Sequence, residues 1–386
     1  MQKTIFKFIL LGYVLLFFAC KKQENIPSSP SNQEKPLLSS ILKDLRIEPI
    51  APIIIQGGTD NIKHFLDKQK QNSLVFLRDS TWSSGGYSKI YQTDEVVVTP
   101  DNESYVYPGS IIKSASVTSG NFAPLKGYTK LPIRITASFP SDKSIGVIDV
   151  PSLSRTRVFL RNALMDPSFS GKQLESFTYS SNFFRSYEES KMAFGYNMNE
   201  KKMFSSVNSS FNSENSRTSY QTGLIMTYLV KNFTLSTPNP EVGELLDLKT
   251  LPAGTMEGVS PVYMDAVTYG RFGFLMIETN MNSELAKTAF EKVIKKIFRR
   301  STETFSLEEQ SLFNSCRITV YLLGSSGGSV TQLLNNPGSY DGLSNFINDS
   351  LGEFTANDPG VPIQFTLKYL LNNESYKPVF KVNYPN

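Results

Sequence analysis

Apolar residues recur at helical spacing most clearly over residues 283–300. The apolar side chains of that stretch form one stripe and its lysines mostly face away, so the pattern predicts an amphipathic helix. Shorter helices are predicted at 36–45, 158–164 and 342–354.

Other stretches are typical of β-strands. Runs rich in β-branched and aromatic residues, bounded by Gly, Pro, Asp or Asn, predict strands at 73–77, 95–98, 133–139 and 363–369. The stretch 231–258 contains Pro238, Pro240, Pro252, Gly243 and Gly254, and is predicted to be a long connection. After residue 20 no apolar run approaches the roughly 18 residues of a transmembrane helix.

The segment 191–220 has an unusual pattern. It begins with strict alternation, placing Met192, Phe194, Tyr196 and Met198 on one side, and becomes Ser/Asn-rich over 205–219. A membrane-spanning β-strand needs only about 9–11 residues with one lipid-facing side. The pattern therefore leaves two interpretations open, a surface excursion and a membrane-inserting hairpin.

Residues 1–20 are typical of a secretory signal. Lys3 and Lys7 precede an apolar stretch at 8–18, and Cys20 directly follows the small residue Ala19, as in the lipobox of bacterial lipoproteins. The sequence thus predicts an exported protein lipidated at Cys20 and anchored at the bacterial outer membrane or cell surface, or released from it. Residues 21–36 are polar and predict a flexible stalk.

Composition excludes several classes of function. One histidine, His64, and two cysteines, Cys20 and Cys316, are too few for a His/Cys metal site or a Ser-His or Cys-His nucleophile pair. A net charge of +4 spread along 386 residues does not indicate nucleic-acid binding. We therefore expect no catalytic residue, no metal and no cofactor. Only a carboxylate-pair hydrolase, for which no motif is present, stays open. His64 is interpreted as a surface residue on a short helix, and Cys316 as a buried structural thiol.

A series of short motifs then occurs in a fixed order along the chain. They are Tyr107-Pro108-Gly109, the strand 133–139 ending at Pro140, Tyr196-Asn197-Met198-Asn199, Tyr269-Gly270-Arg271, Ile277-Glu278-Thr279 and Gly327-Gly328. Each is weak alone, but their shared order resembles the cholesterol-dependent (thiol-activated) cytolysins. These are pore formers related in fold to the membrane-attack-complex/perforin proteins.

The resemblance implies an elongated α+β fold with a central bent antiparallel sheet, flanked by helical clusters, and without a C-terminal β-sandwich. Residues 37–177 and 236–262 would form a scaffold domain with an elongated β connector. Residues 178–235 and 263–345 would form the pore-forming sheet domain, and 346–386 would return to the scaffold. Tyr107, Pro108, Gly109, Tyr269, Gly270 and Arg271 would have structural roles.

By the same resemblance, residues of about 191–220 and 283–313 would insert into a target lipid bilayer. The membrane-inserting candidates are Met192, Phe194, Tyr196, Met198, Phe290 and Ile294. Gly327 and Gly328 would allow the sheet to open. The stretch 283–313 departs from the family pattern. As a strand it would place Lys292 and Lys296 on the same side as Phe290 and Ile294. If that side faced lipid, each charge at the bilayer centre would cost about 2–4 kcal/mol.

The resemblance also implies assembly into a self-oligomer or a hetero-oligomer. The sequence stops at Asn386, where the family's membrane-binding domain would begin, and Trp82 is the sole tryptophan. We therefore expect a longer cytolysin-like relative to supply membrane binding. The alternative is a non-lytic surface lipoprotein that binds a glycan or a host ligand.

Overall fold

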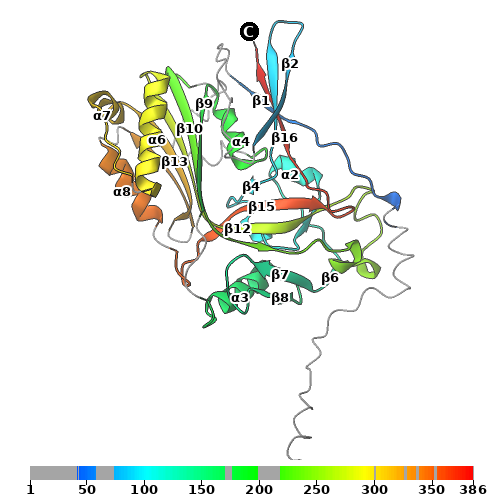
Figure 1. Cartoon of the computed structure of the whole chain (residues 1–386). Helices are drawn as coiled ribbons and strands as arrows, with labels where there is room; N and C mark the ends of the chain where they lie inside the picture. The colour runs from blue at the N-terminus through cyan, green and yellow to red at the C-terminus, as the bar shows by residue number, and fades with distance from the viewer. Residues whose placement is uncertain are drawn as a thin grey trace, which may run out of the picture.

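The computed structural model describes residues 41, 43–57, 74–169, 176–198, 218–299, 301–325, 328–335, 339–351 and 354–385. These residues form an α+β fold with a ten-stranded, a four-stranded and a two-stranded sheet, as expected (Figure 1). His64, Cys20, Gly327 and most of 36–45 and 205–219 lie outside the described residues.

Two long strands organise the large sheet. Strand β10 (Thr222–Ser236) pairs antiparallel with β12 (Val262–Thr279) along nearly its whole length. On its other edge β12 pairs first with β15 (Val361–Tyr369), over residues 262–270, and then with β13 (Arg317–Ser325), over 272–278. β10 likewise pairs with β9 (Ser176–Phe184) at one end and β7 (Ile133–Ala137) at the other. The sheet therefore divides into two branches at the middle of β12.

Shorter strands complete both branches. β14 (Gly328–Asn335) covers the outer edge of β13, and β8 (Ile145–Ile148) pairs with β7. β4 (Val96–Val97) and β5 (Ile111–Ile112) join the branch of β15. β6 (Thr129–Lys130) and β11 (Leu246–Asp247) form the two-stranded sheet.

Close backbone packing marks the branch point. A Cβ on Gly270 would lie 2.0 Å from the carbonyl oxygen of Val230, and Cβ atoms on Gly324 and Gly360 would lie 2.9 and 2.7 Å from the carbonyl oxygen of Gly270. Gly324 and Gly360 also have φ values of +91° and +84°. Only glycine allows three backbone segments to approach this closely.

A separate four-stranded sheet contains the last strand that the structure describes. Its order is β1 (Ile53–Gln56), β16 (Val379–Tyr384), β3 (Tyr87–Gln92) and β2 (Val75–Thr81), with β1 and β16 parallel. One of its faces packs on the core of the large sheet through Ile53, Ile55, Phe380 and Val382.

Helices cover the sheets. The longer ones are α3 (Leu153–Leu164), α6 (Ser283–Arg299), α7 (Leu307–Phe313) and α8 (Tyr340–Leu351). Short helical turns are α2 (Ala115–Ser119), α4 (Lys191–Phe194), η1 (Glu103–Tyr105), η2 (Tyr187–Ser190), η4 (Val242–Glu244) and η5 (Leu248–Thr250). No helix among the described residues is long and apolar enough to cross a membrane.

The predicted elements compare well with these bounds. The helix at 283–300 and the strands at 95–98, 133–139 and 363–369 are confirmed, with ends shifted by a few residues. The strand predicted at 73–77 begins at Val75 and continues to Thr81. The prediction of a connection from residue 231 is wrong for 231–236, which belong to β10.

The branch point generates a stability prediction. Gly270→Ala should lower the free energy of unfolding by about 3 kcal/mol, because the new methyl group meets the backbone of β10 and cannot be accommodated by a rotamer change. Urea unfolding measures this. Gly243→Ala is the matched control, since no atom lies within 4 Å of its Cβ position and it should change stability by less than about 0.5 kcal/mol. Equal effects of the two substitutions would contradict the packing argument.

Candidate functional site

Two long segments interrupt what would otherwise be simple hairpins. Residues 185–221, the first segment, connect β9 to β10, and residues 280–316, the second segment, connect β12 to β13. The segments have equal length. Both leave the sheet at the same end, because Phe184 pairs with Gly223 and Arg317 with Glu278. The regions predicted to insert, 191–220 and 283–313, lie within these segments.

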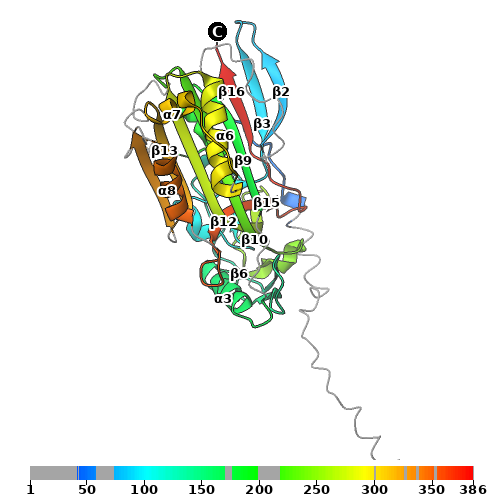
Figure 2. The same cartoon turned by 60° about the vertical axis from the view of Figure 1, so that its left-hand side comes forward.

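The second segment packs on one face of the sheet as α6 and α7 (Figure 2). The interface is apolar, with Ala289, Phe290, Val293 and Ile294 fully or almost fully buried against side chains of β10, β12 and β13. Lys292 donates to Glu309, which is 3% exposed, with the two charged groups 2.8 Å apart. Burial alone would raise the pKa of the Glu309 carboxyl, but the hydrogen bond from Lys292 and the helix-capping bonds lower it.

The described start of the first segment, residues 185–198, packs on the opposite face, where α4 lies (Figure 1). The ring of Phe194 contacts those of Phe272, Phe274 and Tyr321, with centroids 5.7 to 6.5 Å apart. The next residue, Gly195, has φ +75°, and a Cβ there would lie 2.5 Å from the carbonyl oxygen of Glu95. These contacts hold the start of the segment against strand β4.

Tyr196 adds a polar anchor to the first segment. Its hydroxyl lies 2.9 Å from Thr99 Oγ1 and accepts a hydrogen bond from Asn102 Nδ2 at 3.2 Å. Burial raises the pKa of the Tyr196 phenol. The hydroxyl therefore stays protonated at neutral pH and keeps both contacts.

The six membrane-inserting candidates share one property in this conformation. Phe194, Tyr196, Met198, Phe290 and Ile294 are buried, and Met192 is partly buried. The alternation at 192–198 is not a strand here, because residues 191–194 form α4. Residues 191–198 are also not a surface excursion, since their side chains anchor the segment.

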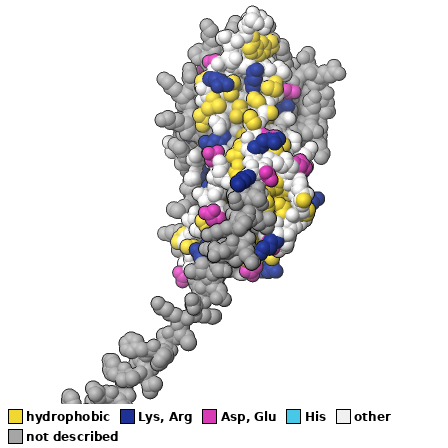
Figure 3. Space-filling view, turned by 90° about the vertical axis from the view of Figure 1, so that its right-hand side faces the viewer, with side chains coloured by type: hydrophobic (Ala, Val, Ile, Leu, Met, Phe, Trp, Pro, Cys, Tyr) yellow, Lys and Arg dark blue, Asp and Glu magenta, His cyan; other side chains and the backbone are white. Residues whose placement is uncertain are grey.

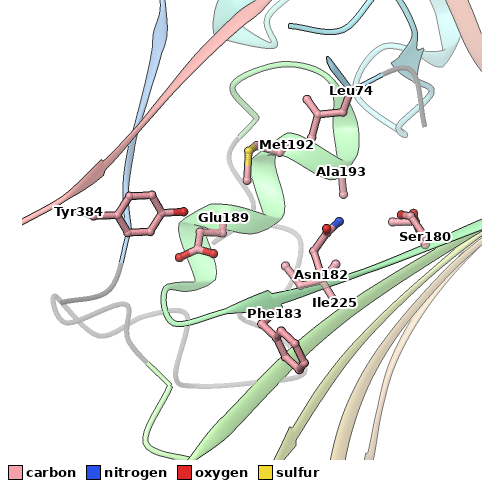
Figure 4. A pocket seen from close by; sticks show the side chains of 10 residues that line it. Leu74, Ser180, Asn182, Phe183, Glu189, Met192, Ala193, Ile225 and Tyr384 are labelled. Atoms are coloured by element: carbon pink, nitrogen blue, oxygen red, sulfur yellow. The ribbon is translucent and has the colours of Figure 1, made fainter. Parts of the chain in front are cut away.

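A small pocket separates the first segment from β9 and β10 (Figure 4). Its lining is Leu74, Ser180, Asn182, Phe183, Glu189, Met192, Ala193, Ile225, Thr227 and Tyr384. The hydroxyls of Ser180 and Thr227 lie 2.7 Å apart within it. The described start of the first segment thus lies over a hollow lined by both polar and apolar side chains, whereas the second segment packs mainly through apolar side chains.

One buried cluster joins the bases of both segments. We call it the root cluster: Glu278, Arg317, Tyr187, Thr218 and Tyr220. Glu278 is fully buried and lies 2.7 Å from the Arg317 guanidinium on the neighbouring strand. Tyr187 and Thr218, at the two ends of the first segment, both donate to Glu278 through their hydroxyls, and Arg317 lies over the ring of Tyr220 at 5.0 Å.

The electrostatics of the root cluster favour the charged form of Arg317. Burial alone would lower the pKa of the Arg317 guanidinium, but the adjacent Glu278 carboxylate raises it. Tyr187 and Thr218 join the described ends of the first segment to Glu278, whereas the Glu278–Arg317 pair lies between neighbouring strands of the sheet. The cluster therefore links the first segment to β12 and β13.

The edge of the sheet is linked to the second segment. β14 covers the outer edge of β13, and α8 follows it. Lys296 of α6 lies 4.4 Å above the ring of Tyr340 in α8 and 5.5 Å above that of Phe305. Removal of β14 and α8 from the sheet edge would break this contact. Within the described part of the chain, the outer edge of β9 pairs with no strand.

The remaining predicted residues have structural contacts. Gly109, with φ +81°, donates its N–H to the carbonyl of Met264, and the Tyr107 hydroxyl accepts from Lys130 at 2.8 Å. Pro108 lies between them in the same turn. Tyr269 stacks on Phe233, and Arg271 lies 3.1 Å from Asp358 and over the ring of Phe354. Gly328 begins β14, opposite Ser325.

Sequence reasoning missed two features. Gly324, near the end of β13, has a positive φ and a close backbone contact and was not among the selected residues. Arg317 was not selected either, although an arginine at the head of an apolar strand is a signal for a buried partner. Cys316 is confirmed as a buried thiol, and burial raises its pKa to about 12. No group of metal-binding side chains occurs among the residues that the structure describes.

The root cluster generates a second stability prediction. Glu278→Gln should lower the free energy of unfolding by about 3 kcal/mol, because it leaves the mostly buried Arg317 without a counter-charge. Urea unfolding at neutral pH measures the loss. Arg46→Gln, which removes the exposed Arg46–Glu48 pair, is the control and should cost less than about 1 kcal/mol. A loss no larger than the control's would show that the root cluster does not stabilise the fold.

Comparison with known proteins agrees with this architecture. The family model for thiol-activated cytolysin matches residues 87–382. Pneumolysin of Streptococcus pneumoniae is 24% identical over 293 residues, which cover 73% of this chain and 60% of pneumolysin. Tetanolysin of Clostridium tetani is 21% identical over 291 residues, covering 73% and 54%. The chain thus spans about 60% or less of the length of these relatives.

Solved structures show the same fold. A pneumolysin structure has a TM-score of 0.69 at 22% identity and covers 93% of this chain and 75% of pneumolysin. Listeriolysin O has a TM-score of 0.65 at 15% identity, covering 92% and 74%. Because the family model matches well over half of the sequence, this chain belongs to the thiol-activated cytolysin family.

Proposed function

We propose that this protein is a pore-forming cytolysin that oligomerises and inserts β-hairpins into a target membrane. The observation that carries the proposal is the pair of equal segments that leave the same end of one sheet, and whose described residues pack on its opposite faces. Family membership supports the same function.

Membrane physics explains why oligomerisation would be needed. In a bilayer every backbone N–H and C=O must be hydrogen-bonded within the protein, so extended hairpins are stable only in a closed barrel. A spanning strand takes about 9–11 residues, and each segment is long enough for two strands and a turn. Two hairpins per subunit would close a barrel only when many subunits pair edge to edge, through β9 and the edge of β13 that β14 now covers.

A reducible cross-link between the second segment and the sheet tests the insertion model. The Ser181 hydroxyl of β9 lies 3.1 Å from the Glu291 carboxylate of α6, so the two positions face each other. Thiols introduced by Ser181→Cys and Glu291→Cys can be joined by a short reducible bis-thiol reagent that spans the length of the removed glutamate side chain. In a preparation that releases dye from liposomes, the cross-linked double variant should release less than about a tenth of the dye that its reduced form releases, because α6 cannot leave the sheet.

The single variants Ser181→Cys and Glu291→Cys are the controls and should leak equally with and without reductant. Cys316 should not interfere, because its thiol is buried and protonated. Full leakage by a quantitatively cross-linked protein would remove the insertion model.

We further propose that pore formation depends on a longer cytolysin-like partner. As a strand, the second segment has charges on both sides: Lys292 and Lys296 alternate with Phe290 and Ile294, and Glu291 and Lys295 occupy the opposite side. Either side facing lipid would bury charges at a cost of about 2–4 kcal/mol each, so an assembly made only of this chain would insert poorly.

Mixing experiments test the dependence on a partner. This protein at micromolar concentration should release little dye from target vesicles by itself, and at least about tenfold more when a longer relative that binds the membrane is present. The relative alone at the same concentration is the control. Efficient release by this protein alone would show that no partner is needed, and would leave the insertion model intact.

The proposal for the N-terminus is lipidation of Cys20. Placement of this cysteine after Ala19 at the end of an apolar stretch supports it. The mature protein should begin at Cys20 with the added mass of a lipid modification and partition into detergent, whereas Cys20→Ser should stay in the aqueous phase. An exported parent protein with an unmodified N-terminus would exclude lipidation. No described feature specifically favours the alternative of a non-lytic glycan-binding or ligand-binding lipoprotein.

A further inference from the structure

The four-stranded sheet has two different faces. Its inner face is buried at Ile53, Ile55, Phe380 and Val382 and exposed at β2. Its outer face, defined by strand register, carries a row of Ile54, Lys381, Ile90 and Arg78 across all four strands. The flanking rows are Gln56, Asn383, Ser88 and Ser80 on one side and Val379, Gln92 and Val75 on the other. We call these eleven residues the outer face.

The apolar content of the outer face is high for an open sheet. The solvent face of an antiparallel sheet is usually polar. Here Ile54 is 47% and Val75 is 56% exposed, and Ile90 and Val379 are half-buried. The edge strand β2 also exposes Leu77, at the irregularity between Phe76 and Arg78. Exposed apolar side chains gathered on one sheet in this way indicate a binding surface.

The charges on the outer face have one sign. Arg78 and Lys381 are its only ionised side chains, and neither is paired with a described carboxylate. The single carboxylate in these four strands, Asp79, pairs in register with Lys89 and belongs to the inner face. The outer face therefore complements an anionic surface.

Trp82 lies at the margin of the outer face. This residue follows β2, and its indole N–H donates to Ser88 Oγ at 2.8 Å, which in turn donates to Asn383 Oδ1 at 2.9 Å. Trp82 remains partly exposed. Figure 3 shows this side of the molecule, with hydrophobic and Lys/Arg side chains interleaved over its upper part and Asp/Glu side chains mostly toward its margins.

We propose that the outer face binds the anionic headgroups of a lipid bilayer. Cations mixed with Trp and branched aliphatic side chains are typical of groups that lie at a membrane interface. The β2–β3 hairpin points to one end of the molecule (Figures 1 and 2). Both segments leave the large sheet at that same end, so a membrane fits this surface better than an acidic protein does. This contact goes beyond the proposed pore function, since binding requires no insertion.

The sole tryptophan gives a direct readout. Trp82 is the only Trp in the chain, so any shift of tryptophan emission reports this region. The full chain is mixed with vesicles of phosphatidylcholine, or of phosphatidylcholine with phosphatidylglycerol. The emission should move to shorter wavelength only with the anionic vesicles, and the apparent affinity should fall as salt is raised.

Charge removal tests the surface itself. Arg78→Gln and Lys381→Gln should each weaken vesicle binding about fivefold, and the double variant about 25-fold. Arg134→Gln, an exposed cation on β7 at the opposite end of the molecule, is the matched control and should bind normally. Ile54→Ser should also weaken binding, with little effect on the fold because the side chain is half exposed.

Three results would overturn the proposal: no emission shift with anionic vesicles, equal binding to neutral vesicles, or equal loss of binding in Arg134→Gln. An acidic protein as the true partner would give the first result. Dye leakage is recorded in the same samples. Binding without leakage would support the lipid contact while counting against pore formation by this chain alone, so the two proposals fail separately.

Discussion

The change of strand partners along β12 is the constraint on which the rest of the structure depends. A strand buried on both faces must have both edges hydrogen-bonded along its length, and β12 satisfies one edge with β15 up to Gly270 and with β13 from Phe272. The chain can make this change only where its backbone segments nearly touch, which requires the glycines at the branch point. The branch that contains β9, β10, β12 and β13 therefore joins the other branch at one end only. Both segments leave this branch at its opposite end.

The two segments are held by different kinds of contact. The second is held by an apolar interface, where each buried side chain contributes in proportion to its area. The described part of the first is held chiefly by Phe194, Tyr196 and the root cluster, and it lies over a pocket lined by polar and apolar side chains. In the proposed insertion, departure of the first segment would leave Glu278 paired only with Arg317.

Sequence reasoning predicted elements with a one-sided pattern and missed those without one. α6 has a single apolar stripe because one of its faces is exposed, and the spacing predicted it closely. β12 is buried on both faces, so its residues do not alternate between apolar and polar. β10 extends to Ser236, into the stretch 231–258 whose prolines and glycines indicated a connection. In the root cluster, Arg317 contacts Glu278, which is 39 positions away in the sequence, and Tyr187, which is 130 positions away. No local sequence pattern connects residues at such separations.

The buried carboxylates define where each segment packs on the sheet. Buried charges such as Glu278 and Glu309 are each paired with a cation and hydrogen-bonded by residues of the stored segments, so they specify the folded position more than they stabilise it. Apolar contacts alone would permit many packings of α4 and α6 on a flat sheet, whereas a carboxylate in an apolar site tolerates only the arrangement that supplies its donors. A segment held in this way has one defined conformation, and the proposed insertion would require it to give up these donors.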